Sequence, residues 1–263
     1  MFSLDDKTVV DLSPLLKARI HRVDGSIEEG NTDPNGKPWV MTEGRYAGDN
    51  SLFTLYGAPS TGDDVWPAER QTAHHGVHVQ GGGGHICHWS GVPDAMKGIW
   101  EMPAETFVGD AAVCYLADLS PITAKERGDY PPVQVREGDT CGQEITPDHL
   151  SNVQVGDIVL LASPFDGTER PWLSEATCEW LVSDRNVRMV GFGAGIAWEY
   201  HLKLATPDNS PVKRVLLGAD VPIVQPLVNI ETLSKDRVFF MGLPLRMSKM
   251  EASFTRALAF EDK

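Results

Sequence analysis

The feature that most constrains the fold is a succession of strand, helix and strand between residues 156 and 193. The segment GDIVLLAS (156–163) follows a turn signal and is almost entirely apolar, which is typical of a buried strand. LSEATCEWLVSD (173–184) follows a proline, has Ser174 as an N-cap and spaces its apolar residues as a helix does. VRMVGFG (187–193) is again typical of a buried strand. A helix between two such strands predicts a right-handed crossover beside a sheet, and so an α/β fold.

Further apolar strands are predicted on both sides of this unit, at residues 110–119, 221–233 and 237–247. Residues 24–70 are rich in Gly, Pro, Asp and Asn, so we expect loops and short turns there. Loops of this length usually form a binding loop or a subunit contact. The pattern predicts one α/β domain with a mixed sheet over residues 1–263.

The net charge limits the partners that the chain can bind. Its 263 residues carry a formal charge of −14, which repels nucleic-acid phosphates and anionic lipid headgroups. The first twenty residues include acids and no apolar run of signal-peptide length, and no stretch approaches the roughly 20 apolar residues of a membrane helix. We therefore expect a cytoplasmic protein that binds neither nucleic acid nor membranes. The separated cysteines form no C-x-x-C pair and predict neither a disulfide framework nor a zinc knuckle: Cys87, Cys114, Cys141 and Cys178.

Five of the eight histidines lie within residues 71–89, QTAHHGVHVQGGGGHICHW, around a run of four glycines. On a flat strand His74 and His78 would lie ~13 Å apart, too far to share one metal ion held ~2.1 Å from each nitrogen. On a helical turn or a tight bend, which Gly76 and residues 81–84 permit, the same pair approaches to ~6 Å. The spacing is compatible with a metal site, with a set of proton carriers and with a solvated polar loop.

This segment resembles the motif H-x-G-T-H-x-D-x-P-x-H of the cyclase-like family, which includes bacterial kynurenine formamidase and isatin hydrolase. From His74 to His85 the chain reads H-H-G-V-H-V-Q-G-G-G-G-H. Later blocks of the family are similar to RPWLSEATCEWLVSDRNVRMVGFG, VLLGADVPIVQPLVNIETL, VFFMGLPLRM and FTRALAF. The resemblance spans most of residues 8–260.

The resemblance implies a swivelling β/β/α fold, a homodimer or homotetramer, and metal-assisted hydrolysis of amide-like bonds in a small-molecule substrate. In such relatives the first two motif histidines and the aspartate bind metal, which assigns these roles to His74, His78 and Gln80. A later histidine and a glutamate complete a two-metal site in the family. The last motif histidine, here His85, moves protons.

Several of these positions hold a different side chain in this chain. Gln80 stands where the family has its aspartate, Gln225 aligns with the later glutamate, and Lys213 lies near the later histidine. His85 lies one position beyond the last motif histidine. Neutral amides and an ammonium supply none of the negative charge that a partly desolvated dication requires. Two bound metal ions are therefore not expected.

Two kinds of site stay open. In one, a single divalent ion, zinc or manganese, binds His74, His78 and Gln80 together with waters. In the other, the site holds no metal; the histidines carry protons, and Lys213 stabilises an enolate or an oxyanion in place of a Lewis acid.

The remaining candidates line the substrate pocket. Relatives often place substrate contacts after the strand predicted at 187–193, and aromatic side chains supply apolar surface. Five residues are assigned to the substrate in this way or by alignment: Gln225, Glu199, His201, Trp66 and Trp89. The segment HICHW, with Cys87 and His88, is interpreted as a buried strand.

The leading hypothesis is a cyclase-family hydrolase that opens a C–N, C–O or activated C–C bond in a small, cyclic carbonyl compound. Its catalytic residues are His74, His78, His85 and Lys213. The alternatives are a metal-independent lyase, isomerase or cyclase on the same scaffold, and a family member that binds a ligand without chemistry.

Overall fold

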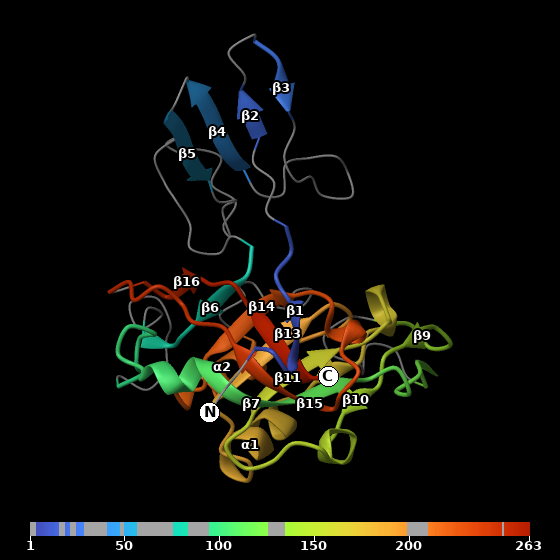
Figure 1. Ribbon diagram of the computed structural model, residues 1–263. Coiled ribbons are helices and arrows are strands. Elements are labelled where there is room, and N and C mark those ends of the chain that lie inside the picture. Colours follow the sequence, from blue (N-terminus) through green and yellow to red (C-terminus); the bar gives the residue numbers. More distant parts are fainter. Residues whose placement is uncertain are drawn as a thin grey trace.

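The computed structural model describes residues 4–15, 19–21, 25–28, 41–47, 50–56, 76–83, 95–125, 135–198, 210–248 and 250–263. A nine-stranded sheet dominates this part of the chain, with strand order β1-β17-β15-β7-β11-β13-β14-β6-β16 (Figure 1). In chain order its strands are β1 (Lys7–Asp11), β6 (His78–Gln80), β7 (Val108–Tyr115), β11 (Ile158–Ala162), β13 (Met189–Gly193), β14 (Ile223–Leu227), β15 (Arg237–Met241), β16 (Ala252–Phe254) and β17 (Leu258–Asp262).

The sheet is mixed, as predicted. Its centre is parallel, because β7, β11, β13 and β14 pair in parallel as neighbours. Antiparallel strands flank this centre: β15, β17 and β1 on one side, β6 and β16 on the other. The binding edge of such a sheet lies at the carboxyl ends of its parallel strands.

Two helices form the crossovers from β11 to β13 and from β13 to β14, and they pack against each other. Helix α1 (Glu175–Ser183) begins after Ser174, whose side chain accepts a hydrogen bond from the Thr177 N–H, so the predicted helix and its N-cap are confirmed. Helix α2 (Pro211–Gly218) was not predicted. It begins after Ser210, whose hydroxyl accepts from the Lys213 N–H, and has Pro211 in its first turn.

The two faces of the sheet bury different hydrophobic clusters, because side chains alternate along each strand. On the helix-covered face, Val159, Val190 and Ile223 pack with residues of α1 and α2 such as Leu181 and Leu216. On the opposite face, the neighbours of these strand residues belong to a second cluster that contains Ile158, Met189, Val224 and Phe240. The cluster to which a strand residue belongs therefore indicates which face of the sheet it lies on.

Three predicted strands are shorter than the sequence indicated, each for a local reason. The strand predicted at 110–119 ends at Tyr115 because a turn closes between Leu116 and Leu119. The one predicted at 221–233 ends at Leu227, since Asn229 adopts a left-handed conformation and a 3-10 helix follows. The one predicted at 237–247 ends at Met241, and residues 242–247 form no strand.

Smaller elements complete the described chain. A separate four-stranded sheet has the order β3-β2-β4-β5 (Figure 1), and its strands β4 and β5 fall where only loops and turns were expected. The bounds of these elements are β2 (Arg19–His21), β3 (Ile27–Glu28), β4 (Met41–Ala47), β5 (Asn50–Tyr56), β8 (Ile122–Thr123), β9 (Thr140–Cys141), β10 (Glu144–Ile145) and β12 (Trp172–Leu173), with 3-10 helices η2 (Ala104–Phe107), η3 (Pro147–Leu150), η4 (Gly167–Glu169) and η6 (Ile230–Thr232). Neither α1 nor α2, nor any other helix of the described residues, has the length and apolarity needed to cross a membrane.

Candidate active site

Strand β6 carries two of the predicted site residues on one face. His78 and Gln80 are both buried, with exposed fractions of 4% and 1%, and Val79 between them belongs to the cluster on the helix-free face. Gly76, two residues before the strand, has a φ of 50°, so a turn in the left-handed region leads the chain into β6. The bend that the sequence permits at Gly76 is therefore present.

Strand β14 brings Gln225 beside them. In the antiparallel pair of β6 and β14, Gln225 lies opposite His78 and Ile223 lies opposite Gln80. Ile223 belongs to the helix-covered cluster, whereas Val224 belongs to the other one. His78, Gln80 and Gln225 therefore share the face that α1 and α2 cover.

The imidazole of His78 is held in one orientation. Its Nδ1 lies 3.0 Å from the Gly76 carbonyl oxygen. Because a carbonyl can only accept, Nδ1 carries the hydrogen, and the lone pair of the neutral ring lies on Nε2. This arrangement suits His78 to accept a proton or to bind a cation through Nε2.

Lys213 reaches the same face from α2. It is buried, with an exposed fraction of 6%, and it lies on the helical stripe of Leu216 and Leu217, which pack on the sheet. Helix α2 returns antiparallel to β13 and β14, so it runs in the direction of β6.

Contacts of the glycine run fix the level of Lys213 along the sheet. A methyl group on Gly82 would lie 2.6 Å from the Leu217 carbonyl oxygen. Lys213 precedes Leu217 by ~6 Å along the helix, and Gln80 precedes Gly82 by ~6.6 Å along the strand. Measured along the strand direction, Lys213 and Gln80 thus lie at about the same height. The lysine side chain leans toward the N-terminus of α2, and His78 lies at that end.

The glycines after β6 allow this close packing. Beta carbons on Gly82 and Gly83 would clash with the backbone of Leu217 and of Gly98, at 2.6 and 2.3 Å. The Gly83 N–H also donates to the Lys97 carbonyl oxygen at 2.9 Å. At these positions the run serves to bring α2 and residues 96–99 against β6.

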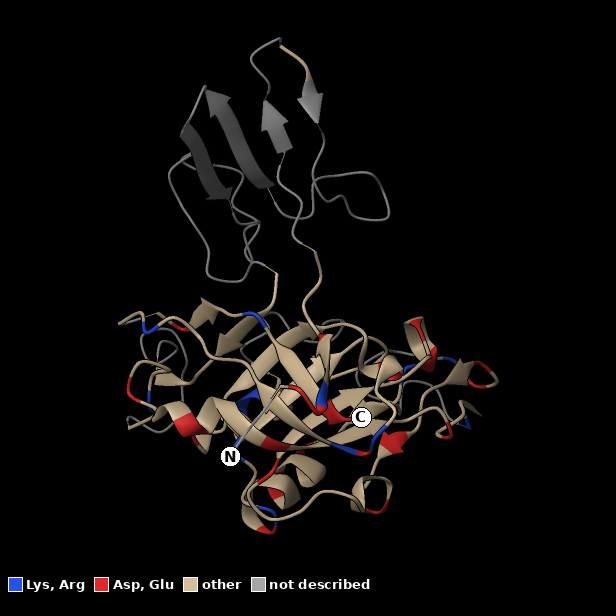
Figure 2. Ribbon diagram, in the orientation of Figure 1, with Lys and Arg blue, Asp and Glu red and all other residues tan. Residues whose placement is uncertain are grey.

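Among the described residues, few charged side chains lie on the strands around His78, Gln80 and Gln225. Figure 2 shows charges mainly at the periphery of the described body, and β6, β11, β13 and β14 contain no Asp, Glu, Lys or Arg. The buried carboxylates of the described chain lie elsewhere: Asp157 pairs with Arg237 at 2.8 Å, and Glu261 accepts from the backbone N–H groups of Ser234 and Lys235. Lys213 is the only buried lysine or arginine among the described residues.

Trp198 is a further residue at this place that the sequence analysis did not select. Its ring stacks on Phe192 at a centroid distance of 4.5 Å, and its carbonyl oxygen accepts from the Ser210 hydroxyl, which caps α2. The pair thus forms an apolar wall beside the helix turn that carries Lys213. Its position five residues after the end of β13, beyond the carboxyl edge, was the signal that could have found it.

Six predicted site residues lie outside the described residues, so their positions stay predictions. They are His74, His85, Trp66, Trp89, Glu199 and His201. The segment HICHW lies outside them as well.

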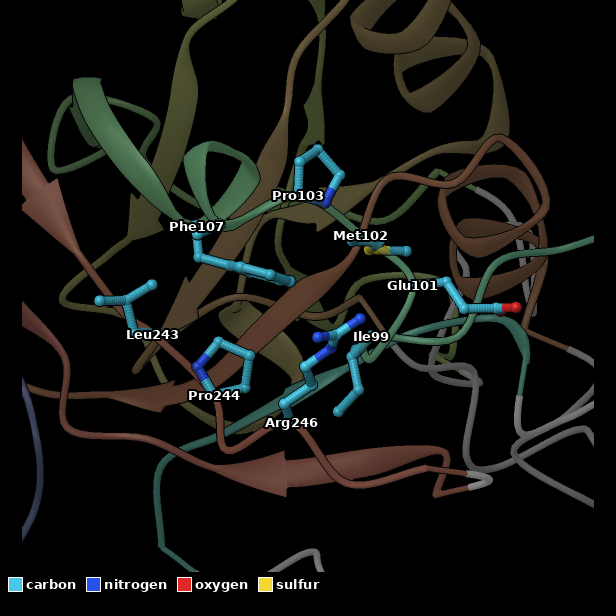
Figure 3. A pocket seen from close by; sticks show the side chains of 9 residues that line it. Ile99, Glu101, Met102, Pro103, Phe107, Leu243, Pro244 and Arg246 are labelled. Atoms are coloured by element: carbon cyan, nitrogen blue, oxygen red, sulfur yellow. The ribbon is translucent and has the colours of Figure 1, made fainter.

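A pocket of about 400 Å³ opens on the other side of the sheet. Figure 3 shows Phe107, Pro103 and Met102 facing Leu243, Pro244 and Arg246 across it. Ile99, Met102 and Phe107 belong to the helix-free cluster, and none of the predicted site residues lines this pocket. It is therefore separate from the group formed by His78, Gln80, Gln225 and Lys213.

Comparison with known structures identifies the fold. A potential metal-dependent hydrolase with cyclase activity matches at 18% identity and a TM-score of 0.56, covering 98% of both chains. Isatin hydrolase A from Labrenzia aggregata, bound to benzyl benzoate, matches at 18% identity and a TM-score of 0.59, covering 98% of this chain and 95% of its own. The chain has the cyclase-like fold.

A second isatin hydrolase with this cyclase-like fold, bound to the product analogue thioisatinate, matches at 14% identity and a TM-score of 0.60, covering 98% of this chain and 94% of its own. No protein-family model matches the sequence, and no curated protein matches it either. The match in fold to these solved structures confirms the α/β class and the mixed sheet predicted from the sequence.

The site residues described on the cyclase-like fold do not suit a divalent metal ion. Gln80 and Gln225 are neutral amides, His78 is a neutral donor, and Lys213 brings a positive charge to the same face. A dication in a buried site requires negative ligands to offset its desolvation. The described residues also contain no group of three or more His, Cys, Asp and Glu side chains that could hold an ion.

Proposed function

We propose that the chain is a cyclase-family hydrolase that opens a C–N, C–O or activated C–C bond in a small, cyclic carbonyl compound. The observation that carries the proposal is the fixed, buried imidazole of His78, opposite Gln225 and on the face of Lys213. The fold supports it, because solved proteins of the same fold include isatin hydrolases. His74 and His85 are proposed as further proton carriers, and Trp66, Trp89, Glu199 and His201 as substrate contacts.

Hydrolysis at this site begins with proton transfer to His78. Nε2 accepts a proton from water while the water oxygen bonds to the carbonyl carbon, and the carbonyl π electrons move onto oxygen. When this oxyanion collapses, the bond to the leaving atom breaks. The leaving atom keeps the electron pair and receives the proton from the imidazolium. In this proposal Gln225 holds the substrate through its amide, and its position opposite His78 supports that role.

The test is turnover of a panel of cyclic imides, aryl amides, lactones and cyclic diketones by the purified chain. His78→Gln should reduce kcat by about 10²–10⁴-fold, the usual contribution of general acid–base catalysis. His149→Gln is the matched control, because His149 is exposed at η3, away from β6. Equal rates for the wild type and His78→Gln would contradict the proposal. A specific ligand without turnover would indicate the non-catalytic alternative.

A second candidate is a lyase, isomerase or cyclase that moves protons next to a carbonyl without adding water. The neutral amides Gln80 and Gln225 favour it, because they replace the carboxylates expected in a metal hydrolase. The two candidates differ in the fate of solvent oxygen. In water enriched in ¹⁸O, a hydrolase places one labelled oxygen in the product at each turnover, whereas the second candidate places none.

We also propose that the chain acts as a homodimer or homotetramer, as the family resemblance implies. Light scattering coupled to size-exclusion chromatography would give the mass directly. A monomer at micromolar concentration would contradict this part of the proposal.

A further inference from the structure

A hydrolytic or enolising site needs a positive group beside the substrate oxygen. Negative charge builds on that oxygen in the transition state, and a fixed cation or a set of N–H donors lowers its energy. The strands around His78 contain no charged residue. The buried ammonium of Lys213 is the one such cation among the described lysines and arginines.

We propose that Lys213 takes the place of a divalent metal ion in this chain, so that the site activates its carbonyl substrate without metal. The inference rests on the proposed function, and it also makes a claim about metal binding that can be tested without any substrate. Lys213 donates N–H hydrogen bonds to the substrate oxygen as charge develops there, while His78 moves the proton.

The position of Lys213 in its helix supports this role. It lies in the first turn of α2, where backbone N–H groups make the helix end positive and acidic residues are normally favoured. Helix α2 has no acidic residue in that turn, and its lysine is buried against the sheet. The helix end and the ammonium thus place positive charge in the same region, an arrangement that favours a developing anion and disfavours a dication.

The neutral side chains near the lysine support the same inference. Gln80 on β6 lies at about the level of Lys213, and Gln225 on β14 lies opposite His78. Their amides can hydrogen-bond a polar substrate but cannot offset the charge of a bound dication. Restoring carboxylates here should matter for metal binding only after the ammonium has been removed.

The first experiment measures metal directly on the full chain. Protein purified without chelator should contain far less than one transition-metal ion per chain by elemental analysis. Its melting temperature and its turnover should be unchanged by EDTA and by added Zn²⁺ or Mn²⁺. A stoichiometric metal ion whose removal lowers the melting temperature would overturn the inference.

The second experiment tests the ammonium. Lys213→Met removes the charge but keeps an unbranched side chain that is one atom shorter. It should lower kcat by about 10²–10³-fold with a small change in KM, the range found for loss of one oxyanion donor. Lys213→Arg keeps a charge and should lose less than Lys213→Met. Arg214→Met, in the same turn but only half-buried, is the matched control and should keep wild-type rates. Unchanged kcat in a folded Lys213→Met variant would overturn the inference.

The third experiment rebuilds a metal site. Adding Mn²⁺ or Zn²⁺ should raise the melting temperature of the triple variant Gln80→Asp, Gln225→Glu, Lys213→His. The same metals should raise the melting temperature of the double variant Gln80→Asp, Gln225→Glu much less. Equal metal stabilisation of the double and triple variants would show that Lys213 does not exclude metal, and would overturn the inference. These metal measurements do not depend on turnover. Stoichiometric metal in an active hydrolase would therefore overturn the inference and leave the proposed function standing. A metal-free wild type without turnover would overturn the proposed function and leave standing the claim that Lys213 excludes metal.

Discussion

His78 and Gln225 lie directly opposite each other on the antiparallel strands β6 and β14. The Cα atoms of such partners are ~4.5–5.5 Å apart, so the two side chains are in reach of each other and of one small molecule. Because β14 follows α2 in the chain, the same crossover that positions Gln225 also positions Lys213. One βαβ unit and one short antiparallel strand therefore assemble the described part of the site.

Changing Gln225 should alter the protonation of His78. Gln225→Glu places a carboxylate opposite the imidazole, which favours its charged form, because an opposite charge within ~4–6 Å stabilises the ion. In a plot of kcat/KM against pH, the ascending limb should therefore move to higher pH by about one unit. Gln225→Leu is the control, since it removes the amide without adding charge and should leave that limb in place. A Gln225→Glu profile identical to the wild type would show that the two side chains do not interact.

Gly83→Ala should destabilise the chain through the backbone that packs against it. A Cβ at this position would lie 2.3 Å from the Gly98 nitrogen, so the backbone around Gly83 or around Gly98 must shift. The cost is about 2–3 kcal/mol in the free energy of unfolding. Gly138→Ala is the control: nothing lies within 4 Å of its added Cβ, and only its φ of 87° opposes the change, at about 1 kcal/mol. Urea unfolding of both variants gives the comparison, and equal losses would refute the packing role of Gly83.

The central crossover could be predicted from the sequence because its signals are local. Strands β11 and β13 are short apolar runs, and α1 begins at a serine N-cap that can be seen in the sequence. Helix α2 has an equally local start at Ser210 and Pro211, but it is only eight residues long and carries Lys213 and Arg214 among its apolar residues. A period of 3.6 is hard to recognise over two turns.

The arrangement of the candidate site residues could not be predicted from the sequence. The motif selected His78 and Gln80, and the later blocks selected Lys213 and Gln225, yet no local pattern says that Gln225 lies opposite His78. That register depends on pairing between strands far apart in the sequence, and a slip of one residue would turn His78 to the other face. The strands β4 and β5 were missed for a different reason, because the Gly, Asp and Asn residues around them favour a loop interpretation.

The described cysteines should be unreactive in the native protein. Burial raises the pKa of the Cys114 thiol to about 12, and burial likewise raises the pKa of Cys178 and Cys141. The thiolate is the reactive form, so these three should not react with a disulfide reagent at pH 8. We expect at most one fast thiol, Cys87, in native protein and four in denaturant. Two or more fast thiols in native protein would contradict the burial of these side chains.

The ion pair of Asp11 and Arg256 should make a small, acid-sensitive contribution to stability. Burial raises the pKa of Asp11, but hydrogen bonds from Arg256 and Ser13 together outweigh it, so the pKa lies below its ordinary value of 3.8. A carboxylate with a lowered pKa stabilises the native state above its unfolded pKa, and this contribution is lost as the pH falls through the folded pKa. Both side chains are more than a third exposed, so solvent screening limits the contribution to a few tenths up to about 1 kcal/mol.

Asp11→Asn should therefore lower the free energy of unfolding at pH 7 by this amount, and the difference from the wild type should shrink below about pH 4. Urea titrations of both proteins at pH 7, 5 and 3 measure it. Arg256→Met serves as the partner variant, since the cation that Asp11 contacts at 2.7 Å is removed while the carboxylate stays. If Asp11→Asn destabilised the chain equally at pH 7 and pH 3, the charge of Asp11 would not be the source of its effect, because Asn keeps the oxygen that accepts from the Ser13 N–H.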